Sequence, residues 1–480
     1  MVTRAFDLPA TPAYRCPLAS ATFGAVALSI GLLLAPLRAN AAVNPAPTIH
    51  LVLGTHPPRT LQIDVAKLFH TLTVDFFSQD DGTVYVQTGD IPAMWLRDSS
   101  AQTLPYVRFA PLFPNLAPRI RGVIERNAKN VLTDPYANAF TSGYVSWEDK
   151  WEVDSLAYPV TLAWTYWQTT GDRAIFTRHF HWAMAHTVST YECEQHHLRC
   201  SRYRSRMLRN GGEGAYYART GMIWGAFRPS DDPVRYPYNI PQQMFAAVAL
   251  EELATLVEAG YHDEGLAYRA RVLGAALRAA IERYGVVYDF RYGWMYAYEV
   301  DGYGNSELMD DANVPNLISI PTFGFESGDD ALYRTTRAFA LSTDNPFFYR
   351  GAYAVGLGSS HTPTGWVWPL GMMARALTAG SWGEVEQMLT QLRASGGAEA
   401  LFHESLDPDR PWRFTRTEFG WANASYAELL FRSIAGFPPE DPLARSFSPP
   451  AKTPQMPDIV ARWENAGIML TTFQRISGSL

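Results

Sequence analysis

The chain has 480 residues, of which 47% are hydrophobic and 18% are charged. This balance is ordinary for a packed globular protein and excludes an intrinsically disordered chain. The net charge is −7, few of the basic residues are lysines and the arginines form no basic stripe, so nucleic acid is not expected as a partner. Aromatic residues make up 13%, which fits either a large aromatic core or a cleft in which flat rings stack on sugars.

The first 41 residues have the features of a secretory signal peptide. Arg4 and Arg15 precede an apolar run at residues 23–35, and Ala39-Asn40-Ala41 has the pattern of a cleavage site. The apolar run is short for a membrane span, so we expect cleavage after residue 41 and a secreted or periplasmic mature protein. An uncleaved anchor is the alternative. The mature sequence contains no stretch long and apolar enough to predict a membrane span.

Apolar residues at helical spacing predict a mostly helical chain. The expected helices cover residues 118–134, 156–167, 175–188, 244–256, 266–284, 332–341, 372–377, 385–392 and 426–434, and Gly or Pro stands near most of their ends. Short strands are expected at residues 83–87, 286–290 and 295–300. Because strands do not alternate with helices, a parallel α/β sheet is not expected. The helices follow one another in pairs, which predicts an all-α fold of helical hairpins in a closed ring, with long loops at one end.

Two cysteines remain in the mature chain, Cys193 and Cys200, with His196 and His197 between them. In an oxidising compartment the cysteines would close a short disulfide loop. The Cys-x-x-His-His-x-x-Cys spacing also permits a zinc cluster. We favour a disulfide or free thiols, because the segment is polar and lies away from the richer motifs.

Carboxylates in aromatic surroundings fill the long loops between the predicted helices. Six groups have this composition: residues 85–100, 147–154, 221–233, 298–302 with 309–315, 356–363, and 402–408 with 419–423. In the first group, Arg97 and Asp98 follow Trp95. A carboxylate accepts hydrogen bonds from two hydroxyls and a guanidinium donates in a fork, so these side chains suit a sugar.

Local structural roles explain some of the same residues. Asp98 or Ser99 is expected to cap a helix, and Glu152 and Asp154 are favourably placed at a helix start. Residues 230–232 form a Ser-Asp-Asp sequence typical of a turn. The alternative is a functional acid whose pKa is raised by its neighbour and by apolar cover.

Other chemistries have less support in the sequence. It contains no phosphate-binding glycine loop, no Gly-x-Ser-x-Gly elbow and no His-Glu-x-x-His helix. None of the Asp-rich turns has calcium-loop spacing. What the chain offers is carboxylates among aromatic rings, and glycosidic cleavage needs one protonated acid and one ionised base.

Seven ordered segments together resemble glycoside hydrolase family 125, the exo-acting α-1,6-mannosidases with an (α/α)6 barrel. They are residues 88–100, 134–140, 150–158, 227–232, 309–315, 358–362 and 403–405. The resemblance spreads over nearly the whole mature domain and implies a catalytic barrel at residues 42–436. Residues 437–480 lie outside it and begin with a Pro-rich stretch, which predicts an extended C-terminal tail.

The resemblance also implies roles for individual residues. Asp231 would be the general acid and Glu404 the general base of an inverting enzyme that uses no metal and no cofactor, with Asp232 as the alternative acid. The two carboxyls of an inverting pair stand roughly 6.5–9.5 Å apart. The residues expected to hold the terminal mannose of an oligosaccharide or N-glycan are Arg97, Asp98, Glu152, Arg228, Asn313 and His361.

Two positions depart from the family pattern: Ser360 stands where proline is expected and Gln243 where asparagine is expected. Two other classes of protein stay open. One is a sugar epimerase or polysaccharide lyase on a similar helical barrel, with His361 or His403 as base. The other is a carbohydrate-binding protein without turnover. Both classes stay open because the fold alone does not distinguish them from a hydrolase.

Overall fold

A computed structural model describes residues 48–53, 59–113, 115–396 and 401–434. The predicted signal peptide (1–41) and the predicted tail (437–480) lie outside these residues, so both stay predictions. Across the described ranges, no helix combines the length and apolar character needed to cross a membrane.

About half of the described residues lie in helices, and the structure extends several of the expected helices. The α-helices are α2 (Val65–Val74), α3 (Leu96–Thr103), α4 (Leu116–Thr133), α5 (Val153–Thr170), α6 (Arg178–Glu194), α7 (His197–Cys200), α8 (Arg209–Gly212), α9 (Ile240–Tyr261), α10 (Glu264–Tyr284), α11 (Ala331–Ala340), α12 (Pro369–Leu377), α13 (Trp382–Ser395) and α14 (Gly420–Ile434). Short 3-10 helices are η2 (Leu104–Phe109), η3 (Arg173–Ile175) and η4 (Ile320–Phe323).

Short antiparallel strands connect the helices and are more numerous than predicted. They are β1 (Thr48–Leu53), β2 (Arg59–Asp64), β3 (Phe76–Ser78), β4 (Val84–Val86), β5 (Met94–Trp95), β6 (Ala139–Phe140), β7 (Ser146–Glu148), β8 (Tyr238–Asn239), β9 (Val286–Asp289), β10 (Gly293–Tyr296), β11 (Glu299–Val300), β12 (Ser306–Glu307), β13 (Phe348–Arg350), β14 (Val355–Leu357), β15 (Leu406–Asp407) and β16 (Arg410–Phe414). They form two- and three-stranded sheets, such as β5–β6–β7 and β8–β11–β12. Every described pairing is antiparallel, so no parallel α/β sheet forms within the described ranges.

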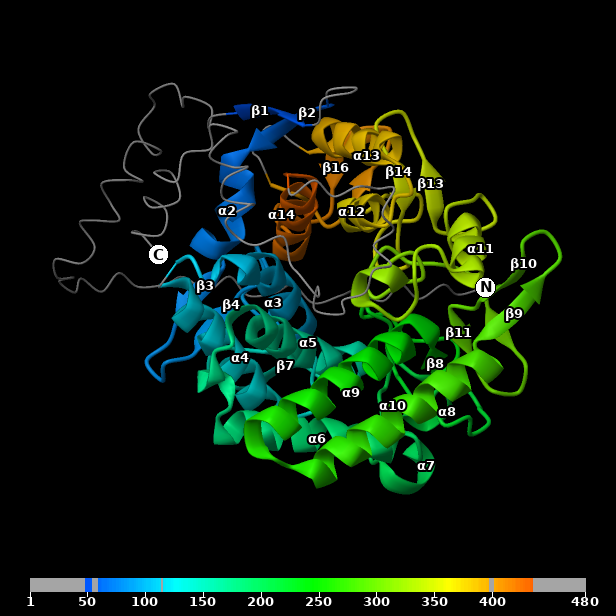
Figure 1. Cartoon of the computed structure of the whole chain (residues 1–480). Coiled ribbons are helices and arrows are strands. Elements are labelled where there is room, and N and C mark those ends of the chain that lie inside the picture. Colours follow the sequence, from blue (N-terminus) through cyan, green and yellow to red (C-terminus); the bar gives the residue numbers. More distant parts are fainter. Residues whose placement is uncertain (1–47, 54–58, 114, 397–400, 435–480) are drawn as a thin grey trace, which may run out of the picture. The chain divides into compact units, whose positions relative to one another are not determined.

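Helices pack in pairs, with one member toward the interior (Figure 1). α3 packs on α5 and α14, α5 packs on α9, and α12 packs on α14. These interior helices are each backed by another: α9 by α10, α12 by α13, α14 by α2, and α5 by α4. The segment before α11 lies between α9 and α12. Its η4 contacts α9, and Ala312, which precedes η4 in the sequence, lies against Gly371 of α12.

Burial along α9 and α10 explains which helix lies inside. The first turns of α9 are buried on every side, from Ile240 to Leu250, because this stretch is apolar or amide-bearing all round. α10 buries only one stripe, which includes Leu266, Leu273 and Leu277, and its other faces are polar. A helix covered all round by apolar neighbours belongs to the core, whereas a helix with one apolar stripe covers it.

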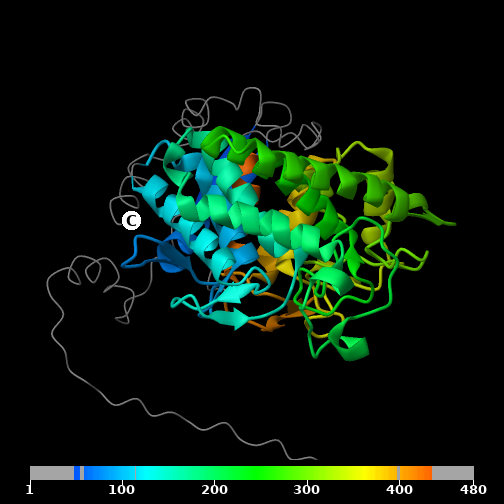
Figure 2. The ribbon, with the colours of Figure 1, turned by 90° about the horizontal axis from the view of Figure 1, so that it is seen from below.

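The long loops lie on one side of the helices (Figure 2). The sheet of β6 and β7, the hairpin of β15 and β16, and the loop at residues 201–237 all lie there. The interior helix α3 begins directly after β5, and α9 begins directly after β8. Short strands therefore directly precede the N-terminal ends of these two interior helices.

The predicted cap at Asp98 or Ser99 is wrong. α3 begins at Leu96, its cap position is Trp95, and no side chain caps it. β5 pairs with β6 and runs straight into the helix, so the helix starts earlier than the polar residues indicate. Asp98 lies in the first turn, where it remains available for other contacts.

Candidate active site

A cavity of about 300 Å³ opens at the N-terminal ends of the interior helices. Its lining comes from all parts of the chain: Thr88, Ile91, Trp95, Arg97, Asp98, Trp147, Glu148, Lys150, Pro229, Ser230, Asp231, Asn313, His361, Trp368, Glu404, Arg416, Phe419 and Trp421. Aromatic walls with a few convergent polar groups are typical of a small-ligand site. Of the predicted site residues, this cavity brings together Arg97, Asp98, Asp231, Asn313, His361 and Glu404.

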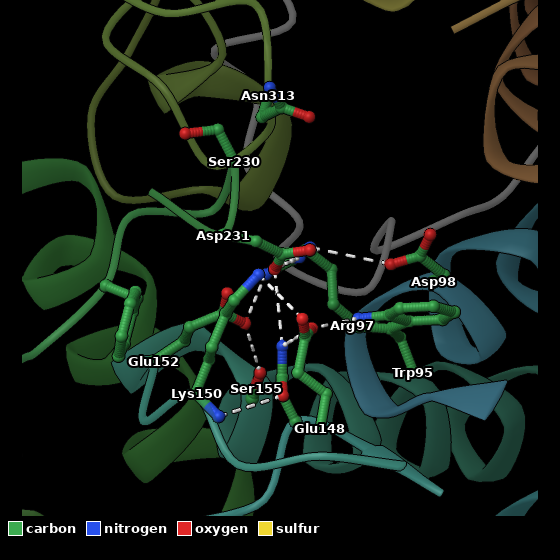
Figure 3. Close-up of polar contacts among 12 residues, drawn as sticks. Trp95, Arg97, Asp98, Glu148, Lys150, Glu152, Ser155, Ser230, Asp231 and Asn313 are labelled. Carbon is green, nitrogen blue, oxygen red and sulfur yellow. Dashed lines mark hydrogen bonds and ion pairs between the residues drawn. The ribbon is translucent and has the colours of Figure 1, made fainter. Parts of the chain in front are cut away.

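Arg97 is the centre of a buried ionic cluster (Figure 3). Its Nη1 donates to Glu152 at 2.6 Å and to Asp154 at 3.3 Å, and its Nη2 donates to Asp231 at 2.9 Å. Its Nε lies 3.6 Å from a carboxylate oxygen of Asp98. These acids raise the pKa of Arg97, although burial alone lowers it, so the guanidinium stays charged.

Asp231 enters the cavity from a strained turn. Its φ is +63°, a left-handed conformation that is uncommon for residues other than glycine and that often marks a functional site. Asn138 donates to the same oxygen as Arg97, at 3.3 Å. Burial raises the pKa of Asp231, but a hydrogen bond with Glu152 and the charges of Arg97 and Lys150 outweigh it, so the pKa lies below its usual range.

Glu152 does not line the cavity and lies behind Asp231 instead. It occupies the cap position of α5 without capping it, because its side chain turns to Arg97 and accepts from Ser155 at 2.8 Å. Its carboxyl is fully buried. The cavity lining therefore gives no direct support to the prediction that Glu152 holds mannose. Glu152 instead contacts Arg97 and Asp231, which both line the cavity.

Glu148 and Lys150 add an ion pair to the same wall. Lys150 Nζ lies 2.6 Å from Glu148, and Glu148 also accepts from Trp95 at 3.3 Å and from Asn138 at 3.0 Å. Figure 3 shows these side chains beside Asp231. The pair fixes Asn138, which in turn contacts Asp231.

Glu404 lines the cavity from the segment before β15. Thr415 donates to its Oε2 at 3.1 Å, and Arg416 Nη1 lies 3.6 Å from its Oε1. Arg416 is held in place by Asp90 at 2.8 Å and by the Thr88 carbonyl at 2.6 Å. A carboxylate with a fixed cation beside it and one face on the cavity can take a proton from a water molecule.

Asp232, unlike Asp231, does not line the cavity. Ser360 donates to it at 2.5 Å and Ser230 at 3.1 Å, and His361 Nδ1 lies 3.4 Å away. The hydrogen bond with Asp232 raises the pKa of His361 to about 9, so His361 is a cation at neutral pH. Ser360, which departs from the family pattern, supplies one of these contacts.

Asp98 and Asn313 complete the polar lining. Burial raises the pKa of Asp98 to about 7, although the charge of Arg97 opposes this. Asn313 is oriented by Asp311, which accepts from both its backbone and side-chain nitrogens at 2.9 and 2.8 Å. A carboxyl poised near neutral pH and a fixed amide are suitable partners for sugar hydroxyls.

Arg228, like Glu152, is a predicted site residue that does not line the cavity. It donates to Glu299 at 2.6 and 3.2 Å and is absent from the cavity lining. Its weaker contact with Ser360, at 3.5 Å, links it to the loop of His361. Arg228 therefore connects its own loop to Glu299 and to the loop of Ser360 and His361.

Arg416 and Lys150 are cavity residues that the sequence did not single out as site residues. Lys150 lies in a matching segment, and in the group at residues 147–154 only Glu152 was assigned a role in the site. Arg416 lies outside every matching segment, and its partner Asp90 is 326 residues away in sequence. No local signal identifies such a residue.

Cys193 and Cys200 form a disulfide, which resolves the choice between the pairing and a zinc cluster. The intervening His197 pairs with Glu194 at 2.7 Å and stacks on Trp224. Among the described residues, no group of three or more His, Cys, Asp or Glu side chains is arranged to hold a metal ion.

A family model described as a metal-independent α-mannosidase, glycoside hydrolase family 125, matches residues 60–146 and 141–431. The chain belongs to this family, and the resemblance read from the motifs is confirmed. It is therefore a glycoside hydrolase that acts on mannosides, which disfavours the lyase, epimerase and binding-protein alternatives.

Individual relatives agree with the family match. The meiotically up-regulated gene 157 protein of Schizosaccharomyces pombe is 35% identical over 416 residues, covering 76% of this chain and 82% of that protein. A Streptococcus pneumoniae metal-independent α-mannosidase, solved in a non-productive complex with α-1,6-mannobiose, is 39% identical with a TM-score of 0.74, covering 76% of this chain and 91% of that one. A bacterial glucoamylase bound to acarbose shares the fold at 14% identity and a TM-score of 0.51, covering 75% and 52% of the two chains.

Proposed function

We propose that this protein is an exo-acting, inverting α-mannosidase that releases terminal α-1,6-linked mannose from oligosaccharides or N-glycans. The observation that carries the proposal is that Asp231 and Glu404 line one sugar-sized cavity together with Arg97, Asp98 and His361. The two carboxyls come from loops far apart in sequence and line the same cavity. An acid and a base on two sides of one sugar ring are what inverting hydrolysis requires.

The reaction uses these two carboxyls in one step. As the general acid, Asp231 delivers a proton to the glycosidic oxygen as the bond to the anomeric carbon breaks. Glu404 takes a proton from a water molecule, whose oxygen attacks the opposite face of that carbon. The mannose leaves with inverted configuration, and Asp231 is left ionised.

Neighbouring side chains prepare the site for this step. Trp95, Trp147, Trp368 and Trp421 supply aromatic surfaces for the sugar. Arg97, Asp98 and Asn313 present donors and acceptors to its hydroxyls. A cavity of about 300 Å³ lined by residues of the Arg97 cluster favours removal of one residue from a chain end over cleavage within a chain.

The α-1,6 linkage is proposed from the pneumococcal relative, which was solved with α-1,6-mannobiose in work on N-linked glycans. Its identity of 39% and the match of the family model across the cavity segments support the same substrate class here. A mannose-containing glycan is therefore the proposed partner.

We also propose that the interior helices close into an (α/α)6 barrel. The contacts α14–α3, α3–α5, α5–α9 and α12–α14, with Ala312 against Gly371, support a continuous ring. A secreted or periplasmic location is proposed from the signal-like residues 1–41, and the Cys193–Cys200 disulfide supports an oxidising compartment.

The proposal is tested by incubating the mature protein with α-1,2-, α-1,3- and α-1,6-mannobiose and measuring released mannose. We expect release from the α-1,6 isomer, and a loss of about 10²–10⁴-fold in kcat for Glu404→Gln with binding retained. Equal hydrolysis of all isomers would contradict the proposed α-1,6 specificity. Full activity of Glu404→Gln would contradict the role of Glu404 as general base.

A further inference from the structure

A single guanidinium faces four buried carboxyl groups at the base of the cavity. Arg97 contacts Asp98, Glu152, Asp154 and Asp231, each within 3.6 Å. One positive charge does not balance four negative charges in a site from which water is largely excluded. Burial of unpaired carboxylates is costly, and such groups retain protons instead.

The other cations near Asp231 already have acidic partners. Lys150 lies 2.6 Å from Glu148, and His361 lies 3.4 Å from Asp232. Both lower the pKa of Asp231, but neither supplies surplus charge to the cluster as a whole. At least one of its carboxyls therefore carries a proton at neutral pH.

Glu152 is the carboxyl best placed to carry that proton. Its Oε2 accepts from Arg97 at 2.6 Å and from Ser155 at 2.8 Å, whereas its Oε1 is buried with no donor facing it. An ionised oxygen in that position would lose its solvation without compensation. A proton on Oε1 removes this cost and leaves Oε2 free to accept from both donors.

Asp154 differs from Glu152 in this respect. Gln242 donates to its Oδ1 at 2.6 Å and Arg97 to its Oδ2 at 3.3 Å, so both oxygens have donors.

Burial raises the pKa of Glu152 well above its usual range, and the nearby charge of Asp231 raises it further, against the effect of Arg97.

We propose that Glu152 is a positioning residue that stores the catalytic proton: Glu152 and Asp231, which both accept from Arg97 and are hydrogen-bonded to each other, share one proton that Asp231 delivers to the glycosidic oxygen. This inference rests on the proposed function, because it assumes that Asp231 is the general acid. It assigns Glu152 a role in proton supply in place of the predicted contact with mannose.

The proton balance is simple. Before the step, Glu152 holds the shared proton and Asp231 is ionised. As the glycosidic bond breaks, this proton passes from Glu152 through Asp231 to the leaving oxygen, so both carboxyls end the step ionised against Arg97. The proton that Glu404 takes from water returns to solvent, and a solvent proton restores Glu152 before the next turnover.

The kinetic test is Glu152→Gln, which keeps the shape and an acceptor for Arg97 but holds no transferable proton. For α-1,6-mannobiose we expect kcat to fall about 10²-fold or more. For 2,4-dinitrophenyl α-mannoside, whose leaving group needs no proton, we expect a loss of less than about tenfold. The alkaline limb of the kcat/KM profile for mannobiose should move to lower pH, because Asp231 alone then sets it.

Glu252→Gln is the matched control. Glu252 is a buried carboxyl of α9 that accepts from Thr161 at 2.6 Å in a different cavity, and burial raises its pKa to about 8. We expect its substitution to change neither the leaving-group dependence nor the pH limb. Equal losses of Glu152→Gln on both substrates, or an unmoved limb, would overturn the proposal.

Infrared spectroscopy tests the shared proton without catalysis. With the Glu252→Gln protein as background, we expect a protonated glutamic acid band at neutral pH that disappears when Glu152→Gln is added. If the band stays, Glu152 does not hold the proton, whatever the enzyme hydrolyses. If the band disappears but wild type releases no mannose, the proton store stands as a structural feature and the proposed function fails.

Discussion

Arg97 Nη2 donates a 2.9 Å hydrogen bond to Oδ1 of Asp231, across 134 residues of sequence. This bond ties the first turn of α3 to the loop that carries the proposed acid. It sets the direction in which the strained Asp231 turn presents its carboxyl to the cavity. The geometry of the acid therefore depends on the planar fork of one arginine.

Arg97→Lys tests this dependence. A lysine keeps the charge but cannot bridge Glu152 and Asp231 with two fixed donors, so we expect kcat/KM for α-1,6-mannobiose to fall about 10²-fold. Arg269→Lys is the control, because Arg269 makes an exposed pair with Glu192 on the surface. Near-wild-type kinetics of Arg97→Lys would show that charge alone is sufficient there.

Asp231→Asn and Asp232→Asn separate the two candidate acids. We expect Asp231→Asn to lose about 10²–10⁴-fold in kcat on mannobiose and much less on an aryl mannoside with a good leaving group. Asp232→Asn leaves the cavity-lining carboxyl in place and changes only the contacts of Asp232 with His361, Ser360 and Ser230. If the leaving-group dependence follows Asp232 instead, the acid has been assigned to the wrong residue.

The pair of His361 and Asp232 predicts a pH-dependent stability. The folded pKa of His361, about 9, lies above the unfolded value of roughly 6.5. A raised pKa means that the pair stabilises the fold fully below the unfolded value and that this contribution is lost as pH rises through 9. We expect the Tm difference between wild type and His361→Gln to be largest near pH 6 and to shrink toward pH 10, as thermal unfolding would measure. A difference independent of pH would contradict the ion pair.

Trp147 predicts a binding effect at the rim of the cavity. Trp147 is 50% exposed although it lines the site, so part of its surface is available to a bound sugar. We expect Trp147→Ala to raise KM for mannobiose roughly two- to tenfold, corresponding to about 0.5–1.5 kcal/mol of ring contact, with kcat little changed. Trp182→Ala, on the exposed surface of α6, is the control. An unchanged KM for Trp147→Ala would remove this contact.

Helices were predictable where apolar spacing and an end signal agree. The helix expected at residues 156–167 forms as α5 and ends with Gly171 as its cap, because Gly171 adopts the left-handed conformation. The start of α3 was not predictable from its polar residues, because strand pairing of β5 with β6 determines it. Two-residue strands of this kind depend on contacts between distant segments and leave no periodic signal.

Residues of the site could be predicted only where they stand in a recognisable sequence motif. Asp98, Asp231 and Glu404 stand in segments whose composition already points to sugar chemistry, and all three reach one cavity. Arg416 carries no such signal, since only the folded chain brings it to Glu404 and Asp90. Glu152 looked like a mannose ligand or a favourable helix start, and its burial behind Asp231 depends on the cluster around Arg97.

The anomeric form of the first product is the most direct test of an inverting acid–base pair. We would follow α-1,6-mannobiose hydrolysis by proton NMR from the first minutes, before the released sugar equilibrates between its two forms. The account predicts that β-mannose appears first, and that Glu404→Gln abolishes its appearance. Early release of α-mannose, or no mannose at all from wild-type protein, would contradict it.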